Sequence, residues 1–191
     1  MIKVMLDKLK VALLQREKLR LNDANLIPSA VLVPIYLKEG EFFILFTKRT
    51  ERVRVHKGQI SFPGGAYRKS DKTLLNTALR ESAEEISLEP SRVEMLGELD
   101  DTATVTSEYL ISPFVGLIPW PYKFKLDRRE VEEIIEAPIS ALMDKNCLEV
   151  VTKRMEGREL SFYYYHYQGR IIWGATAAIL KQFLDIFRSL T

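Results

Sequence analysis

The sequence predicts an α/β fold in which a mixed β-sheet lies between helices. Two observations predict it: segments rich in Val, Ile, Phe and Tyr recur along the chain, and helix-like segments stand at three separate places among them. The 191 residues are 47% hydrophobic and 28% charged, which is an ordinary composition for a chain that buries a core. We therefore expect one globular unit with an extra helix at its N-terminus.

The first 25 residues are charged throughout, which favours an amphipathic helix, expected over residues 3–20, over a signal peptide. The apolar side chains of this helix could pack on the domain or on a partner subunit. Residues 26–191 are expected to form a single domain, because no linker, repeat or low-complexity stretch divides them.

Within that domain, hydrophobic periodicity separates strands from helices. A turn at Lys38-Glu39-Gly40 joins the first two strands, and an alternating aromatic tract over 162–167 indicates a strand with one face in the core. Strands are expected over residues 29–37, 41–49, 93–99, 110–118, 130–135, 148–152 and 160–168, and helices over 72–86 and 175–189.

The helix over 72–86 carries three carboxylates on one side. Glu81, Glu84 and Glu85 stand at i, i+3 and i+4, which places them within a sector of about 100°. On a helical wheel they border the apolar stripe, so we expect them to line a crevice beside the sheet. Like charges at this spacing repel by a few tenths of a kcal/mol per pair, and a divalent cation would offset that repulsion. A simple solvated face is the alternative.

Two adjacent glycines precede this helix. Gly64 and Gly65 follow a short strand-like run, residues 59–62, and come before a polar loop. Adjacent glycines permit positive φ and close backbone approach, so we expect a turn whose carbonyls or amides reach a ligand or a metal.

The spacing of these features resembles the signature of the Nudix hydrolases, G-x5-E-x7-R-E-U-x-E-E-x-G-U, where U is aliphatic. Two positions depart from it: one extra loop residue leaves Asp71 as the nearest acid to the early Glu, and Ser87 replaces the late Gly. The resemblance implies a Nudix α/β/α sandwich with a mixed β-sheet. The matching residues are Arg80, Glu81, Ala83, Glu84, Glu85 and Leu88.

The residues upstream resemble the LLTxRS…R-x3-G-x3-FPGG extension of the coenzyme A pyrophosphatase branch of this family; they are residues 45–50, Arg54 and residues 58–65. This resemblance implies hydrolysis of the pyrophosphate bond of coenzyme A or acyl-CoA to 3′,5′-ADP and (acyl-)4′-phosphopantetheine. The alternatives are a Nudix pyrophosphatase acting on another nucleoside diphosphate derivative (ADP-ribose, a dinucleoside polyphosphate or an oxidised nucleotide) and a non-catalytic nucleotide-binding Nudix module.

The resemblance also implies roles for individual residues. Mg²⁺ or Mn²⁺ would be held by Glu81, Glu84, Glu85 and a backbone carbonyl of Gly64, since hard cations suit oxygen ligands. Arg80 would orient the glutamates by salt bridges. Glu81 is the first candidate for the general base; the later candidates are Glu108, Glu130, Glu132, Glu133 and Glu136, with Asp100 and Asp101 as a further pair that could face the site. The expected substrate-binding residues are Arg49, Arg54, Lys57, Phe62, Gly64 and Gly65.

Composition narrows the class of partner. A net charge of +2 and the lack of a basic stripe with interleaved aromatics favour a small-molecule pyrophosphate substrate over nucleic acid. The sequence contains no run of about 18 apolar residues, so we expect no membrane span. The lone Cys147 favours a reducing, cytoplasmic location. A homodimer is a further expectation.

Overall fold

A computed structural model describes residues 2–51, 57–104, 108–155 and 157–191. The helices are α1 (Ile2–Gln15), α2 (Leu74–Ile86), α3 (Ile139–Leu142) and α4 (Gly174–Arg188), with 3₁₀ turns η1 (Lys69–Asp71) and η2 (Pro90–Arg92). The strands are β1 (Ile27–Lys38), β2 (Glu41–Arg49), β3 (Ile60–Ser61), β4 (Gly64–Ala66), β5 (Glu94–Glu98), β6 (Thr102–Ala103), β7 (Tyr109–Leu117), β8 (Val131–Pro138), β9 (Leu148–Met155), β10 (Arg158–Tyr167) and β11 (Arg170–Ile172).

The larger sheet is mixed, as the sequence predicts. Its main path runs β3-β2-β1-β7-β5, while β4, β6 and β8 pair with β1, β7 and β2 respectively. The β1–β7 pair is parallel, and the other pairs of this sheet are antiparallel. Strand β1 is therefore the centre of the sheet, and β4 brings the two signature glycines to one end of it.

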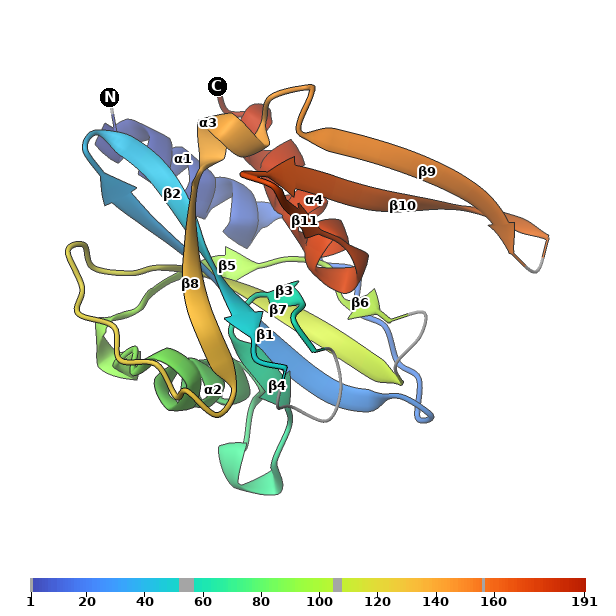
Figure 1. The fold of residues 1–191 in the computed structure, drawn as a ribbon, viewed down its shortest axis with the longest axis horizontal. Helices are drawn as coiled ribbons and strands as arrows, with labels where there is room; N and C mark the ends of the chain where they lie inside the picture. Colours follow the sequence, from blue (N-terminus) through green and yellow to red (C-terminus); the bar gives the residue numbers. More distant parts are fainter. Residues whose placement is uncertain (1, 52–56, 105–107, 156) are drawn as a thin grey trace.

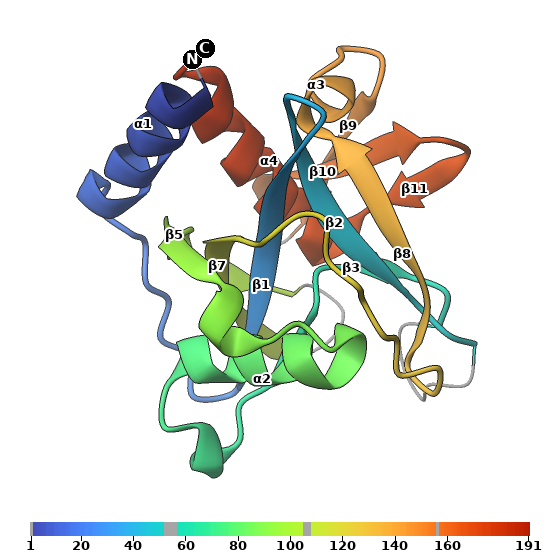
Figure 2. The same cartoon turned by 90° about the vertical axis from the view of Figure 1, so that its left-hand side faces the viewer.

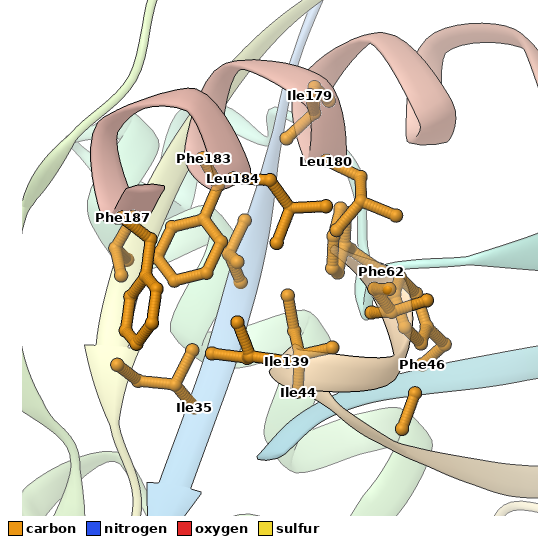
Figure 3. Packing of buried hydrophobic residues seen from close by; sticks show 14 of the residues in the cluster. Ile35, Ile44, Phe46, Phe62, Ile139, Ile179, Leu180, Phe183, Leu184 and Phe187 are labelled. Atoms are coloured by element: carbon orange, nitrogen blue, oxygen red, sulfur yellow. The ribbon is translucent and has the colours of Figure 1, made fainter. Parts of the chain in front are cut away.

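Helices cover both faces of this sheet, α1 and α4 on one side and α2 on the other (Figures 1 and 2). Alternation along β1 explains why both faces are apolar, because successive side chains of a strand point to opposite faces. Val33 and Ile35 join the core beneath α1 and α4, whereas Leu32 and Tyr36 join the core above α2. The α/β/α sandwich is thus confirmed, and Figure 3 shows the α4 side of its core.

Helix α1 packs on the domain itself. Leu9 and Leu13 are buried in the core shared with α4, while Val4 and Val11 on the other side of the helix are exposed. The helix ends at Gln15, so the expected extension to residue 20 is wrong. The chain that follows is not helical and makes polar contacts with the end of β5. None of the helices in the described residues is long and apolar enough to cross a membrane.

A second, three-stranded antiparallel sheet, ordered β11-β10-β9, follows β8 and α3. Its hairpin β9–β10 extends beyond the rest of the molecule in Figure 1. The alternation expected for the aromatic tract is present, since Tyr163, Tyr165 and Tyr167 all pack on the core shared with α4. The sequence analysis did not predict α3, β6 or the strand character of Gly64–Ala66.

Candidate active site

Helix α2 begins and ends at residues suited to those positions. The Thr73 hydroxyl accepts a hydrogen bond from the backbone N–H of Asn76 at 3.1 Å, which satisfies one of the unpaired donors of the first turn. At the other end Ser87 adopts a left-handed conformation, with φ 55° and ψ 35°. That conformation is usually taken by glycine at a helix end, so the departure from the family pattern at Ser87 preserves the backbone geometry.

The three glutamates of α2 do not have equal environments. Glu81 and Glu85 are buried, and the side chain of Glu85 is only 4% exposed, whereas the side chain of Glu84 is 47% exposed. Glu81 and Glu85 therefore lie at the border of the core, as the helical wheel predicts. Glu84 faces outward, so the prediction that it too borders the core is wrong. Across the described parts of the chain, no three or more His, Cys, Asp or Glu side chains are gathered as a ready metal cluster.

Arg80 is fixed between the loop and the glutamates. Its guanidinium donates to both oxygens of Asp71, at 2.8 and 3.0 Å, and to the Ala66 carbonyl at 3.2 Å. It also donates to Glu81 at 2.6 Å and to Glu84 at 3.1 Å. Asp71, the acid nearest in sequence to the early Glu of the family pattern, thus forms a salt bridge with Arg80.

The two glycines serve close packing. Neither is among the glycines with positive φ, and both lie in β4, paired with β1, so a strand stands where the sequence predicted a turn. The close backbone approach that adjacent glycines permit is observed. A Cβ at Gly64 would lie 2.3 Å from the Ala30 carbonyl oxygen, and one at Gly65 would lie 2.7 Å from the Glu81 carboxylate carbon. Gly64 therefore allows strand β4 to approach β1, and Gly65 leaves room for the carboxylate of Glu81.

Glu85 has the chemistry of a cation ligand. Burial raises the pKa of Glu85 to about 8, against the opposing effect of the Arg49 guanidinium, whose Nη1 lies 3.7 Å from Oε1. The other oxygen, Oε2, is buried with no hydrogen-bond partner among the described residues. A buried carboxylate with an unpartnered oxygen, beside Glu81, is a donor set that suits a hard divalent ion such as Mg²⁺ or Mn²⁺.

Glu81 lies in the wall of a cavity of about 680 Å³, whereas Glu84 and Glu85 are not part of the described cavity wall. One wall contains Arg49, Gly64, Gly65 and Glu81, and the opposite part is formed by the hairpin β9–β10 and the start of α4. One lysine and four aromatic residues are prominent in that second part: they are Lys153, Phe162, Tyr163, Tyr164 and Trp173. The cavity therefore joins a carboxylate-rich end to an aromatic end that the sequence analysis did not assemble.

The predicted substrate-binding residues do not all lie at the cavity. Arg49, Phe62, Gly64 and Gly65 all line the cavity. Phe62 also belongs to the core, where it is buried and stacks on Phe46 with ring centroids 4.8 Å apart. Lys57 is exposed in the turn before β3 and is not part of the described cavity wall, so the structure does not bring it to the site. Arg54 lies outside the described residues.

Of the later acids proposed as general base, Glu130 is the one that lines the described cavity. Asp100 and Asp101 instead bind the segment after α1: Asp100 pairs with Arg16 at 2.6 Å and Asp101 with Lys18 at 3.0 Å. The pair thus anchors the N-terminus and does not face the site. Ion pairs or hydrogen bonds likewise engage Glu132, Glu133 and Glu136 with Lys48, Arg170 and Tyr36 respectively, and Glu108 is exposed outside the described cavity wall.

Sequence reasoning missed Arg68. Its guanidinium donates to both oxygens of Glu84, at 3.1 and 3.3 Å, and the residue lines the cavity. The sequence shows that basic residues precede the acidic helix, and one of them could reach the exposed carboxylate of Glu84. Which of them does so depends on the path of the loop.

The fold and the acidic helix beside paired glycines define a class of enzyme. The NUDIX domain family matches residues 26–154, so the chain belongs to the Nudix family and is a Nudix pyrophosphohydrolase. Among its relatives is a protein of Photorhabdus laumondii named "Uncharacterized Nudix hydrolase NudL", 36% identical over 163 residues that cover 85% of this chain and 86% of the relative. A protein of the same name from Pectobacterium atrosepticum is 38% identical over 157 residues, covering 81% and 79%.

Solved structures agree on the fold. A MutT/nudix family protein from Enterococcus faecalis superposes with a TM-score of 0.58 and 11% identity, covering 91% of this chain and 66% of that one. The Ap4A hydrolase of C. elegans, in a binary complex, gives a TM-score of 0.51 and 13% identity over 60% of this chain and 82% of that one.

Proposed function

We propose that this enzyme hydrolyses the pyrophosphate bond of coenzyme A or acyl-CoA to 3′,5′-ADP and (acyl-)4′-phosphopantetheine. The observation that carries the proposal is that the upstream segment and the signature helix meet in one cavity. Arg49 and Gly64, from the segment that resembles the coenzyme A branch, line the same cavity as Glu81. Arg49 also lies beside Glu85, with 3.7 Å between Nη1 and Oε1.

The far end of the cavity supports a substrate that extends beyond the pyrophosphate. Phe162, Tyr164 and Trp173 offer aromatic surface on which a planar base can stack. Lys153 is a cation in the same wall, with its Nζ 5.7 Å from the centre of the Phe162 ring. An adenosine with an additional phosphate presents both a planar ring and a negative charge, which these side chains complement.

The carboxylates carry the chemistry in this proposal. Glu81, Glu84 and Glu85, with a backbone carbonyl of Gly64, would hold Mg²⁺ or Mn²⁺, and the bound ion would lower the pKa of water and neutralise negative charge on the pyrophosphate. Arg80 holds Glu81 in position through the 2.6 Å hydrogen bond. Glu81 is our first candidate to take the proton from the attacking water, and Glu130, which lines the cavity, is the second.

We further infer a cytoplasmic enzyme whose partner is a small pyrophosphate-containing molecule. The lone Cys147 is buried, and its thiol donates to the His166 carbonyl at 3.2 Å, which is compatible with a reducing compartment. Homodimer formation stays a prediction, to be measured by light scattering.

A product assay tests the substrate. Coenzyme A, 3′-dephospho-coenzyme A and ADP-ribose are incubated with the enzyme and Mg²⁺ or Mn²⁺, and the products are identified by mass spectrometry. We expect the highest kcat/KM for coenzyme A, with 3′,5′-ADP as a product. Equal kcat/KM values for the three would reject the coenzyme A assignment in favour of a broader nucleoside diphosphate pyrophosphatase.

A second assay tests the carboxylates. Glu84→Gln and Glu85→Gln keep side-chain size and remove the charge, so we expect turnover to be lost while the thermal unfolding temperature changes little. Retention of activity in both variants would contradict the proposed site. Binding of a nucleotide, detected as increased thermal stability without any hydrolysis by the wild-type protein, would instead favour a non-catalytic module.

A further inference from the structure

Arg68 forms a bidentate salt bridge with Glu84, the exposed glutamate of α2. Nη1 lies 3.1 Å from Oε1 of Glu84, and Nη2 lies 3.3 Å from Oε2, so the guanidinium engages both carboxylate oxygens. Nη2 also lies 3.8 Å from Oε1 of Glu81. Arg68 therefore binds the oxygen atoms that a divalent ion shared by Glu81 and Glu84 would use.

The two arginines beside these acids are not equally fixed. Arg80 is only 20% exposed and is tied to Asp71 and to the Ala66 carbonyl, so its guanidinium is held from behind. The side chain of Arg68 is 56% exposed, and the Asp71 hydrogen bond of 2.9 Å fixes its backbone N–H and leaves the side chain free to turn. An exposed ion pair of this kind is weak and can exchange partners at little cost in free energy.

We propose that Arg68 exchanges between Glu84 and the substrate. In the first position its guanidinium competes with a divalent ion for the Glu84 oxygens. When the ion takes Glu84, the guanidinium turns to a phosphate of the substrate. This inference rests on the proposed pyrophosphatase function, because it assumes both the ion and a phosphate-bearing ligand.

The position of Arg68 makes the second step possible. Arg68 lines the same cavity as Gly65 and Glu81, at its carboxylate-rich end. A guanidinium is a planar fork of donors that matches phosphate oxygens as well as carboxylate oxygens. A substrate phosphate bound next to the ion can therefore accept the hydrogen bonds that Arg68 donated to Glu84.

Metal binding is measured directly, by titrating Mn²⁺ alone into the protein in a calorimeter. If Arg68 competes with the ion, Arg68→Ala should lower the Kd for Mn²⁺ about two- to fivefold, and added salt should reduce the difference by screening the ion pair. Lys69→Ala is the charge-matched control, since Lys69 is an exposed cation one residue along. A Kd for Arg68→Ala that is unchanged, higher, or equal to that of Lys69→Ala would overturn the competition.

Steady-state kinetics with coenzyme A and saturating Mn²⁺ test the second step. Loss of a charge-assisted hydrogen bond should raise KM roughly tenfold in Arg68→Ala, with a smaller change in kcat. Arg68→Lys, which keeps the charge without the fork, should be intermediate. Tighter Mn²⁺ binding with an unchanged KM would overturn the transfer to phosphate. Absence of Mn²⁺ binding to the wild-type protein would instead reject the proposed function, so the two failures are distinguishable.

Discussion

Gly65 is the residue at which the structure makes its sharpest prediction for activity. In Gly65→Ala the new Cβ would lie 2.7 Å from the Glu81 carboxylate carbon and 2.8 and 3.0 Å from its oxygens. Ordinary contact begins near 3.4 Å, so the carboxylate must move by about 0.7 Å. A displacement approaching 1 Å in a catalytic group can cost about 100-fold in rate, and we expect a loss of that order in kcat.

Stability separates this effect from simple damage to the fold. Strand β4 does not require positive φ at Gly65, so alanine there should change the free energy of unfolding by at most about 1 kcal/mol. Gly64→Ala is the matched control, because its Cβ would lie 2.3 Å from the Ala30 carbonyl oxygen and 2.7 Å from the Val31 Cα. That clash is with backbone and should destabilise the protein by about 1–3 kcal/mol, measured by urea unfolding.

A double variant tests the cause. Glu81→Asp withdraws the carboxylate from β4 by one methylene, so Gly65→Ala should cost much less activity in the Glu81→Asp background than in the wild type. Additive losses in the double variant would refute the steric explanation, because coupled residues should give non-additive effects. So would a wild-type kcat for Gly65→Ala, or a stability loss equal to that of Gly64→Ala.

Three further predictions concern the loop, the N-terminal helix and the far cavity wall. Hydrogen bonds from Arg80 hold the pKa of Asp71 well below its usual range, so the stabilisation is present above the ordinary Asp pKa of about 3.9 and is lost as the pH falls through the lower folded value. Asp71→Asn should therefore lower the urea midpoint by a constant amount from about pH 8 to pH 5, with a gap that narrows below about pH 4; a gap that stays constant there would contradict the linkage. Leu13→Ala should lower the free energy of unfolding by about 2–4 kcal/mol, because Leu13 is buried. Leu14 is 65% exposed, so Leu14→Ala should lower it by less than about 0.5 kcal/mol. Equal losses in the two variants would mean that α1 does not pack as described. Lys153→Ala should raise the KM for coenzyme A several-fold more than the KM for 3′-dephospho-coenzyme A, and a parallel rise in both would remove Lys153 as a contact of the additional phosphate.

Much of the fold could be predicted because its periodicities are local. The expected helix over 72–86 is observed as Leu74–Ile86, and the expected strand over 41–49 is observed as Glu41–Arg49. Errors occurred where distant contacts override local preference. Gly64 and Gly65 suggested a turn, but pairing with β1 makes them a strand. The N-terminal helix ends at Gln15, and beyond it Asp100, far along the chain, accepts a hydrogen bond from the backbone N–H of Leu19 at 2.8 Å.

The candidate site was predictable in its acids and less so in its cations. Helical spacing placed Glu81 and Glu85 at the edge of the core, and both are buried there. Position along the chain did not predict which basic residues contact the acids of α2. Lys57 is close in sequence to the glycines but faces solvent, whereas Arg68, which the sequence analysis did not consider, contacts Glu84.

The sequence by itself determined the family, the acidic helix face and the alternation of the strands, because each of these depends on residue identities at fixed short spacings. Only the tertiary structure decided that Gly65 makes room for Glu81, that Asp71 pairs with Arg80, and that β9–β10 forms part of the cavity wall. Those relations join residues separated by many positions in the chain. Their distances follow from how β1, α2 and the hairpin pack, which no local pattern specifies.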